Sequence, residues 1–308
     1  MHFRFKAAAS VLLAGTLWGT ISLFVKPLSA AGLDSLQIAA VRMIVAATLF
    51  SGWIAVRKPA LLRIRLRDCW LFVGTGVCSV TLFNICYFYT IIRSEASVAV
   101  VLLYTSPIFI LLLSALLFHE KITPRKWIAL MLTVGGCVCA AGLSGQSMRL
   151  PIPVLLTGIG SGLFYGLYTV FGRVALRRYD ASTVTAYTFL FGMLATLPFA
   201  RIGTIAAAVA SDPTVLLWCA GIGVCCTVLP YFLYTWGLER MESGKAAILV
   251  AVEPVVGAAL GMAVFHESRS AVKLIGICAV LAAIVLLELP NKNKKTNLQN
   301  LRNVCVCQ

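Results

Sequence analysis

Long apolar stretches follow one another along almost the whole chain, and only short polar turns separate them. A helix of about 20 residues crosses the roughly 30 Å hydrocarbon core of a bilayer, and ten of the stretches approach that length. The pattern predicts an all-α integral membrane protein with ten transmembrane helices. We place them at about residues 7–25, 36–56, 69–92, 96–118, 125–143, 152–171, 182–200, 214–236, 245–265 and 270–289.

One apolar phrase occurs twice in the sequence. PIFILLLSALLFHE at residues 107–120 returns 147 positions later as PVVGAALGMAVFHE at residues 254–267. Further residues match at the same offset, and one constant offset over most of each half indicates an internal duplication. The matched pairs include Gly15 with Gly162, Gly19 with Gly166, Trp18 with Tyr165, Lys26 with Arg173, Tyr87 with Tyr234, Glu95 with Glu242 and Lys126 with Lys273.

Each copy contains five predicted spans. Because five is an odd number, the second copy must enter the membrane from the opposite face. We therefore expect two inverted five-helix repeats at residues 1–145 and 146–290, followed by a basic cytoplasmic tail at 291–308. Many secondary transporters have this architecture, in which two similar halves rock about a central site.

Composition supports lipid as the solvent for much of the chain. Hydrophobic residues make up 60% and charged residues 12%, against about 25% charged residues in soluble domains. Arg4 and Lys6 precede the first span, as in a signal peptide, but its length and its recurrence in the sixth span favour a transmembrane helix. The net charge of +15 comes from short basic clusters between apolar runs, so nucleic acid is not an expected partner.

The distribution of basic residues predicts the orientation. Most of the 26 lysine and arginine residues fall on one side of the predicted spans, together with both chain ends. Cytoplasmic loops carry the excess of basic residues, so both termini are expected in the cytoplasm, with the chain a multi-pass protein of the inner or plasma membrane. Expected partners are the lipid bilayer and a small-molecule metabolite, and self-association into a homo-oligomer is left open.

Neither the histidines nor the cysteines indicate a metal site. His119-Glu120 and His266-Glu267 end matched spans on opposite faces, about 30 Å apart, whereas zinc ligands lie about 2 Å from the ion. We interpret each pair as a helix end, with a latch between loops as the functional alternative. The 11 cysteines include no CxxC pair and mostly lie in apolar runs. No metal and no cofactor are expected, and the pair Cys305 and Cys307 is unexplained.

Two charged residues fall clearly within predicted spans, Arg42 in the second and Glu253 in the ninth. A charge at the bilayer centre costs roughly 2.5–3.5 kcal/mol on insertion scales, so neither side chain is expected to face lipid. Arg42 is close enough to the span end to snorkel to the interface. Glu253 is deeper, and it could balance a substrate ammonium group, carry a coupling proton or pair with Arg42.

Aromatic and amide side chains near the middle of the spans are the other candidates for a substrate cavity. Tyrosine and tryptophan also anchor helices at membrane interfaces, but mid-span positions favour the cavity. Glycines four residues apart lie on one helix face and indicate close helix packing. Prolines at 107, 230 and 254 favour helix kinks, and in transporters such kinks often border the substrate site. The complete set of expected substrate-binding residues is Trp18, Arg42, Asn84, Tyr87, Tyr165, Tyr168, Tyr234 and Glu253.

Ten spans in two five-helix repeats resemble the EamA-type members of the drug/metabolite transporter superfamily. Trp18-Gly19, Arg42 and the phrases at 107–120 and 254–267 carry the likeness, which covers nearly the whole chain except the tail. The resemblance implies that spans one to four and six to nine surround a central cavity, with spans five and ten packed outside. It also implies export of amino acids, related metabolites or toxic compounds.

Three classes of function compete. The favoured one is a secondary transporter that exports amino acids or related small metabolites by alternating access, with a broad-specificity drug or sugar carrier as the alternative substrate class. An intramembrane enzyme is disfavoured, since HExxH is missing and no histidine within a span could activate Ser161. A membrane protein that keeps the fold without transporting is the third, and no catalytic residues are assigned.

Overall fold

The computed structural model describes residues 2–93, 99, 102–140, 151–264 and 271–288, and these residues form helices, turns and short irregular connections, with no strand among them. The longer helices are α1 (His2–Gly19), α2 (Ser22–Ala30), α3 (Ser35–Arg57), α5 (Leu82–Arg93), α7 (Ser106–Phe118), α8 (Pro124–Ala140), α9 (Ile152–Ala175), α10 (Ala181–Thr196), α11 (Ile202–Ser211), α12 (Thr214–Gly223), α13 (Leu229–Leu238), α15 (Val252–Val264) and α16 (Ala271–Glu288). Short elements between them are η1 (Pro59–Leu62), η2 (Leu66–Asp68), α4 (Cys69–Phe72), η3 (Val73–Thr81), η4 (Leu197–Phe199), η5 (Val224–Val228) and α14 (Ser243–Leu249).

Among the residues that the structure describes, six helical segments are long and apolar enough to cross a membrane: Phe5–Ala30, Ser35–Arg57, Leu66–Tyr87, Ile152–Ala175, Ala181–Phe199 and Thr214–Leu238. They coincide with the first, second, third, sixth, seventh and eighth predicted spans. The other four predicted spans overlap the shorter helices α7, α8, α15 and α16. An all-helical membrane protein is therefore confirmed, while the count of ten spans stays a prediction. Helix α11 lies between two predicted spans and was not expected.

Local sequence signals explain where several helices begin. Asp34 precedes α3, accepts a hydrogen bond from the Gln37 N–H at 2.8 Å and donates its own N–H to the Gln37 side chain at 2.8 Å. This reciprocal pair is a capping box. Asp180 caps α10 in a similar way by accepting from the Ser182 N–H at 2.8 Å. Pro151 precedes α9, where a missing N–H costs no intrahelical bond.

Two helices are interrupted at matched positions, just before Pro107 and Pro254. The chain makes a turn at residues 104–105 before α7 and another at 250–251 between α14 and α15. Proline lacks the N–H that would continue a helix, so the kinks predicted at these two prolines are present as helix breaks. Discontinuous helices of this kind line substrate sites in many transporters.

Two segments of π-helix, η3 and η5, end at Thr81 and Val228, which are also 147 residues apart. Segment η3 contains Gly74, and segment η5 follows Gly221 in the chain. The other copy packs against each of these glycines. A methyl group at Gly74 would collide with the ring of Phe171, and one at Gly221 would collide with the ring of Phe24. Phe24 and Phe171 are themselves separated by the same offset. Each copy therefore makes the same contact with the other.

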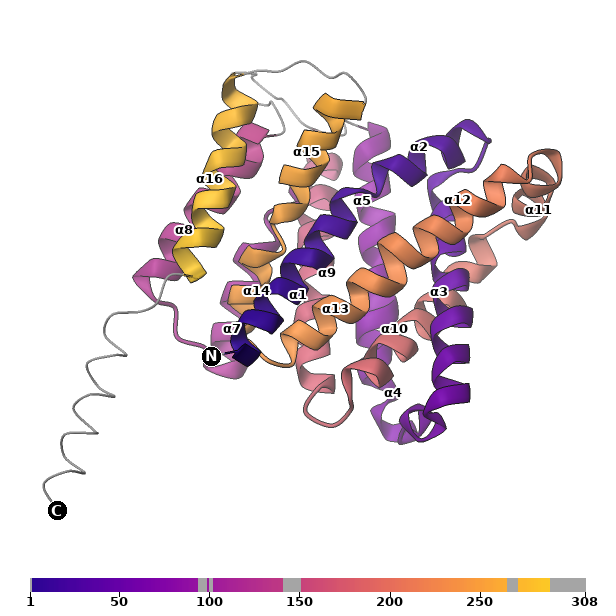
Figure 1. Cartoon of the computed structure of the whole chain (residues 1–308), viewed down its shortest axis with the longest axis horizontal. Coiled ribbons are helices and arrows are strands. Elements are labelled where there is room, and N and C mark those ends of the chain that lie inside the picture. The colour runs from indigo at the N-terminus through magenta and orange to yellow at the C-terminus, as the bar shows by residue number, and fades with distance from the viewer. Residues whose placement is uncertain (1, 94–98, 100–101, 141–150, 265–270, 289–308) are drawn as a thin grey trace, which may run out of the picture.

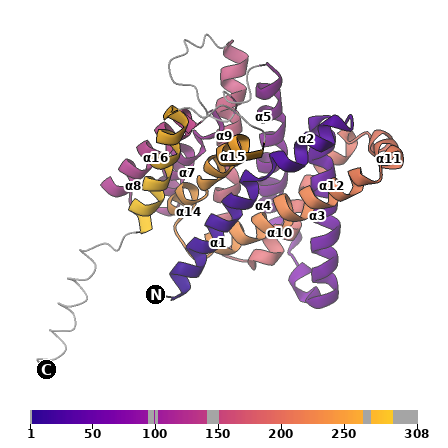
Figure 2. The same cartoon turned by 45° about the horizontal axis from the view of Figure 1, so that its top comes forward.

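The contacts between the longer helices are also equivalent in the two copies. Helix α1 packs against α13, and its counterpart α9 packs against α5, while α3 and α10 pack against each other. Helices α8 and α16 pack together at one edge of the molecule (Figures 1 and 2). Large apolar side chains remain exposed on the surface of the molecule, for example Leu116 at 72% and Ile152 at 72%. An exposed apolar surface of this kind fits a chain surrounded by lipid.

Candidate functional site

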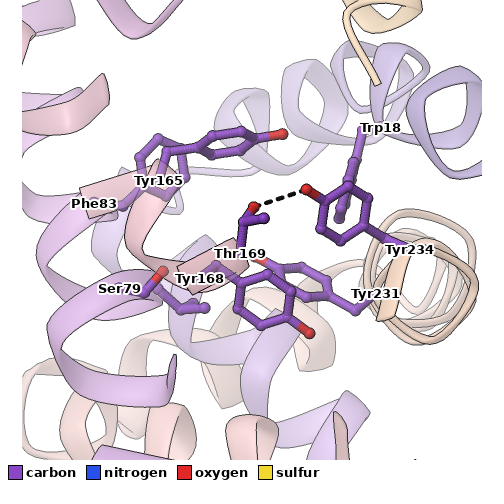
Figure 3. A pocket seen from close by; sticks show the side chains of 9 residues that line it. Trp18, Ser79, Phe83, Tyr165, Tyr168, Thr169, Tyr231 and Tyr234 are labelled. Atoms are coloured by element: carbon purple, nitrogen blue, oxygen red, sulfur yellow. Dashed lines mark hydrogen bonds between the residues drawn. The ribbon is translucent and has the colours of Figure 1, made fainter. Parts of the chain in front are cut away.

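A pocket opens where elements of both copies meet. It lies between α1, η3, α5, α9 and α13, and Figure 3 shows the labelled side chains converging on it. The lining residues are Trp18, Ser79, Val80, Phe83, Tyr165, Tyr168, Thr169, Tyr231 and Tyr234. Four of the expected substrate-binding residues are brought together here: Trp18, Tyr165, Tyr168 and Tyr234.

The rings in this aromatic pocket stack edge to face. The Trp18 and Tyr231 ring centroids lie 5.1 Å apart at 83°, and those of Tyr168 and Tyr231 lie 5.1 Å apart at 89°. Tyr231 also packs edge to face on Phe189, with centroids 5.6 Å apart. Such pairs are favoured over flat sandwiches because the positive ring edge meets the negative face. The rings thus form a closely packed aromatic wall around the pocket.

Hydrogen bonds fix two of the tyrosines. The Tyr234 hydroxyl lies 2.7 Å from the Thr169 hydroxyl, as the dashed line in Figure 3 marks. The Tyr168 hydroxyl lies 2.5 Å from that of Thr235. Both threonines are buried, and a buried hydroxyl without a partner would cost about 1–3 kcal/mol. These bonds hold α9 and α13 in register and orient both phenol rings.

The pocket is narrow in this conformation. The space open to the centre of a water molecule is about 10 Å³, roughly the minimum that one water requires. A metabolite the size of an amino acid cannot enter without the surrounding helices moving apart. The structure therefore shows the aromatic pocket in a closed form.

Glu253 lies behind the wall of the aromatic pocket, in the first turn of α15. The Tyr165 hydroxyl donates to its carboxylate Oε2 at 3.4 Å, so Tyr165 connects the pocket lining to the acid. The backbone at Glu253 packs tightly on Gly19, where an added Cβ would lie 2.6 Å from the Glu253 carbonyl oxygen.

Arg42 does not reach the aromatic pocket. Its side chain is buried, with the residue 8% exposed, so it does not snorkel to the surface. It donates to the Thr227 hydroxyl at 3.1 Å and to the Cys226 carbonyl at 3.2 Å. Both acceptors belong to η5, so Arg42 of the first copy binds the π-helix of the second. The ion pairs formed within the described ranges do not join Arg42 to Glu253.

Asn84 and Tyr87 are carried by α5 and do not line the pocket either. Asn84 is buried at 3% exposure. Tyr87 stacks on Phe83 with ring centroids 5.4 Å apart, and Phe83 in turn meets Tyr165 at 5.4 Å. Tyr87 is therefore one ring removed from the pocket, in contact with its lining.

Five lining residues were not foreseen: Ser79, Val80, Phe83, Thr169 and Tyr231. The internal repeat contains a signal for one of them, because Tyr231 lies 147 residues after the candidate Asn84. Ser79 and Val80 sit on η3, and no residue pattern announces a π-helix. Phe83 and Thr169 are ordinary members of apolar stretches, so only the fold identifies them.

The described His-Glu pair lies at the end of a helix. His119 follows α7 with a positive φ of 54°. Glu120 accepts from the Ser243 N–H at 2.8 Å and the Gly244 N–H at 3.3 Å, which joins the first copy to the second. No group of three metal-ligating side chains gathers in the part of the chain that the structure describes. His266, Glu267 and the cysteine pair in the tail lie outside the described residues.

Comparison with known proteins shows which family the chain matches. The model of the EamA-like transporter family matches residues 5–142 and again residues 152–289. The chain belongs to the EamA-like transporter family. The resemblance seen in the sequence is thereby confirmed, and the chain is a transporter rather than an enzyme. The presence of two copies of one family unit also explains why each half makes equivalent contacts with the other.

Several EamA-like relatives extend over most of the chain. An uncharacterized transporter of Archaeoglobus fulgidus is 29% identical over 90% of this chain and 94% of its own length. The threonine/homoserine exporter RhtA of Salmonella typhimurium is 24% identical over 65% of each chain. A solved crystal structure matches with a TM-score of 0.76 at 18% identity, covering 92% of this chain and 96% of that chain. That likeness concerns the fold alone.

Proposed function

We propose that this protein is a secondary transporter that exports amino acids or related small metabolites by alternating access through the aromatic pocket. The position of the pocket carries the proposal, because its lining comes from α1, η3 and α5 of the first copy and α9 and α13 of the second. A rocking motion of one copy against the other would widen or close it. The name of the relative RhtA supports amino acids as the substrate class.

The two copies are proposed to be inverted five-helix repeats, in a ten-span protein of the plasma membrane with both termini in the cytoplasm. The reciprocal contacts of Gly74 with Phe171 and of Gly221 with Phe24 support a pseudo-twofold relation between the copies. The excess of basic residues on one side supports the orientation. A reporter fused after residue 290 should be active in the cytoplasm, and activity outside the cell would exclude this topology.

The aromatic pocket is proposed to hold the substrate, with Glu253 acting through Tyr165. Rings from Trp18 and Tyr231 provide π faces for an ammonium group or an apolar side chain. Glu253 contacts this wall through the hydroxyl of Tyr165. It would balance the substrate ammonium group or carry a coupling proton. Arg42 would act indirectly, by holding η5 in place.

An ionic network closes one end of the interface between the copies. The Lys126 ammonium group lies 2.6 Å from the Glu242 carboxylate and 3.9 Å from that of Glu120, and it donates to the Lys121 carbonyl at 3.0 Å. Glu120 in turn accepts from backbone N–H groups at the start of α14. We propose that this network holds the cytoplasmic side shut in the closed conformation.

A broad-specificity drug or sugar carrier is the second candidate function. The pocket lining favours it in one respect: apart from hydroxyl groups it consists of aromatic and aliphatic side chains, with no charged residue. Such a surface tolerates many apolar or stacking ligands. The two candidates differ in whether transport requires an amino group and depends on Glu253.

Glu253→Gln distinguishes these candidates. Cells that overproduce the protein would be screened for resistance to amino acids, their analogues, sugars and toxic compounds, and the best compound would be tested in liposomes with and without a pH gradient. For an amino-compound exporter, Glu253→Gln should abolish either transport of the compound or its dependence on the gradient. If both survive intact, Glu253 has neither role, and the carrier of uncharged compounds becomes the better description.

A further inference from the structure

A second, more open hollow lies at the corner where the connection from α3 to α4 meets the turn from α9 to α10. Its volume is about 520 Å³, and it is lined by Arg63, Arg65, Arg67, Asp68, Arg178 and Tyr179. Figure 1 shows the connection between α3 and α4 at the lower end of the molecule. None of its residues belongs to the aromatic pocket or to the Lys126 network.

The base of this arginine hollow is held rigidly. Asp68 has a side chain that is 3% exposed, and it forms an ion pair with Arg178. The Tyr179 hydroxyl donates to the second carboxylate oxygen of Asp68 at 2.7 Å and accepts from the Arg65 N–H at 3.1 Å. Burial and the bond to Asp68 raise the pKa of Tyr179 above its ordinary value.

The rest of the loop is fastened to α10. The Thr183 hydroxyl donates to the Leu61 carbonyl at 2.7 Å, and the Tyr187 hydroxyl donates to the Leu62 carbonyl at 2.7 Å. Ile64 packs against a small core that contains Phe72. The backbone that carries the arginines is thus ordered before any ligand arrives, which reduces the entropy lost on binding.

The hollow has a surplus of positive charge. Asp68 is the acid in its lining, and its ion pair is with Arg178. Arg63, Arg65 and Arg67 are exposed, and the ion pairs of the described residues do not include them. Guanidinium groups bind phosphate oxygens through paired N–H donors. The chemistry of the hollow therefore suits a phosphate group.

Apolar side chains beside the arginines indicate what kind of molecule carries that phosphate. Leu66 is 87% exposed and Trp70 is 52% exposed, and both lie where the chain enters the membrane-length segment Leu66–Tyr87. Tryptophan is enriched at the level of lipid headgroups, and Leu66 and Trp70 expose apolar surface beside the arginines. Trp70 packs edge to face on Phe171 with part of its ring. A soluble phosphate would use the arginines but would leave the exposed surface of Leu66 and Trp70 uncovered.

We propose that the arginine hollow binds the phosphate of an anionic phospholipid, with Arg63, Arg65 and Arg67 contacting the headgroup and Leu66 and Trp70 contacting its acyl chains. Basic pockets at the ends of transmembrane helices bind such headgroups elsewhere. The lipid would fasten the α3–α4 loop of the first copy and the α9–α10 turn of the second to the same membrane surface. The proposal does not depend on the substrate or on the direction of transport.

Native mass spectrometry of the full-length protein in detergent tests the site, with phosphatidylglycerol and phosphatidylcholine as probes. The variant with Arg63, Arg65 and Arg67 replaced by Gln is compared with wild type. A basic side chain near an anionic surface contributes about a factor of five in binding, so the triple variant should bind phosphatidylglycerol roughly 100-fold more weakly. Replacement of the same three residues by Lys should preserve most of the binding.

The matched control replaces Arg57, Lys58 and Lys121 by Gln, which removes the same charge from exposed positions outside the hollow. It should retain nearly all phosphatidylglycerol binding. Equal losses in the two triple variants would reduce the effect to overall charge and overturn the site. Inorganic phosphate at millimolar concentration should fail to displace the lipid, and efficient displacement would assign the hollow to a soluble anion. Should the first triple variant not fold, Arg63→Gln and Arg65→Gln are measured singly, each with an expected loss of about fivefold.

Discussion

The contact between α1 and α15 is tight enough to be tested by a single methyl group. In Gly19→Ala the new Cβ would lie 2.6 Å from the Glu253 carbonyl oxygen and 2.7 Å from the Val256 Cβ, whereas ordinary contacts begin at 3.4 Å. Both neighbours belong to the helix that carries Glu253, and one of them is backbone, so neither can turn aside. The two helices must separate to relieve the overlap. Overpacking of this kind costs about 1–3 kcal/mol.

Gly52→Ala is the matched control, because nothing lies within 4 Å of a Cβ at that position on α3. Replacing glycine by alanine within a helix stabilises it by about 0.5–1 kcal/mol, and this gain is similar in both variants. The difference between the two variants therefore isolates the packing cost. Gly166→Ala should fall between them, since its Cβ would meet the flexible Ile110 side chain at 3.1 Å.

Thermal unfolding of the purified variants in one detergent provides the measurement. For a chain of this size roughly 2 °C of melting temperature corresponds to 1 kcal/mol. We expect Gly19→Ala to melt about 2–6 °C below Gly52→Ala, with Gly166→Ala nearer to the control. Equal melting temperatures for Gly19→Ala and Gly52→Ala would refute the close approach of α1 to α15.

Three further variants test other contacts. Tyr234→Phe leaves the buried Thr169 hydroxyl without its partner at 2.7 Å, and should lower the free energy of unfolding by about 1–3 kcal/mol in a denaturant titration; an unchanged value would mean that this bond contributes nothing. Lys126→Gln removes the cation between Glu242 and Glu120. Its cost in thermal stability should be below the roughly 3–5 kcal/mol of a fully buried pair, because Glu242 is mostly exposed, and transport should become faster if opening of the cytoplasmic side limits the rate. A slower rate at unchanged stability would argue against the gating role. Trp18→Phe should reduce flux of the best substrate, whereas Trp127→Phe, on the edge helix α8, should leave it unchanged.

The general fold could be predicted from the sequence, because lipid offers the backbone no hydrogen-bond partners. Every backbone polar group within the bilayer must be satisfied internally, so an apolar run of sufficient length is a helix. The duplication could be predicted as well, because matched glycines and prolines of the two halves keep one constant offset for steric reasons. The breaks before Pro107 and Pro254 follow from the missing N–H of proline. By contrast, the shorter helices at the predicted fourth, fifth, ninth and tenth spans could not be delimited by hydropathy.

The site was accessible only in part. Mid-span aromatic residues at matched positions pointed to Trp18, Tyr165 and Tyr234, and the structure brings them to one pocket. The cost of a charge in lipid predicts that Arg42 and Glu253 are hidden from lipid. A buried polar partner meets that condition without a place in the cavity. Arg42 meets the requirement by binding η5, through a π-helix that no sequence pattern indicates. Hydropathy cannot distinguish these two ways of hiding a charge.

Flux through the purified protein is the most direct test of the central claim that a small metabolite crosses the membrane through the aromatic pocket. The measurement is time-dependent uptake of radiolabelled threonine, homoserine and the best compound from the resistance screen into liposomes containing wild type, Trp18→Phe or Trp127→Phe. The account predicts saturable uptake by wild type and Trp127→Phe, above that of protein-free liposomes, and a marked reduction in Trp18→Phe. Uptake that is equal in the two tryptophan variants, or no uptake of any compound by folded wild type, would contradict it.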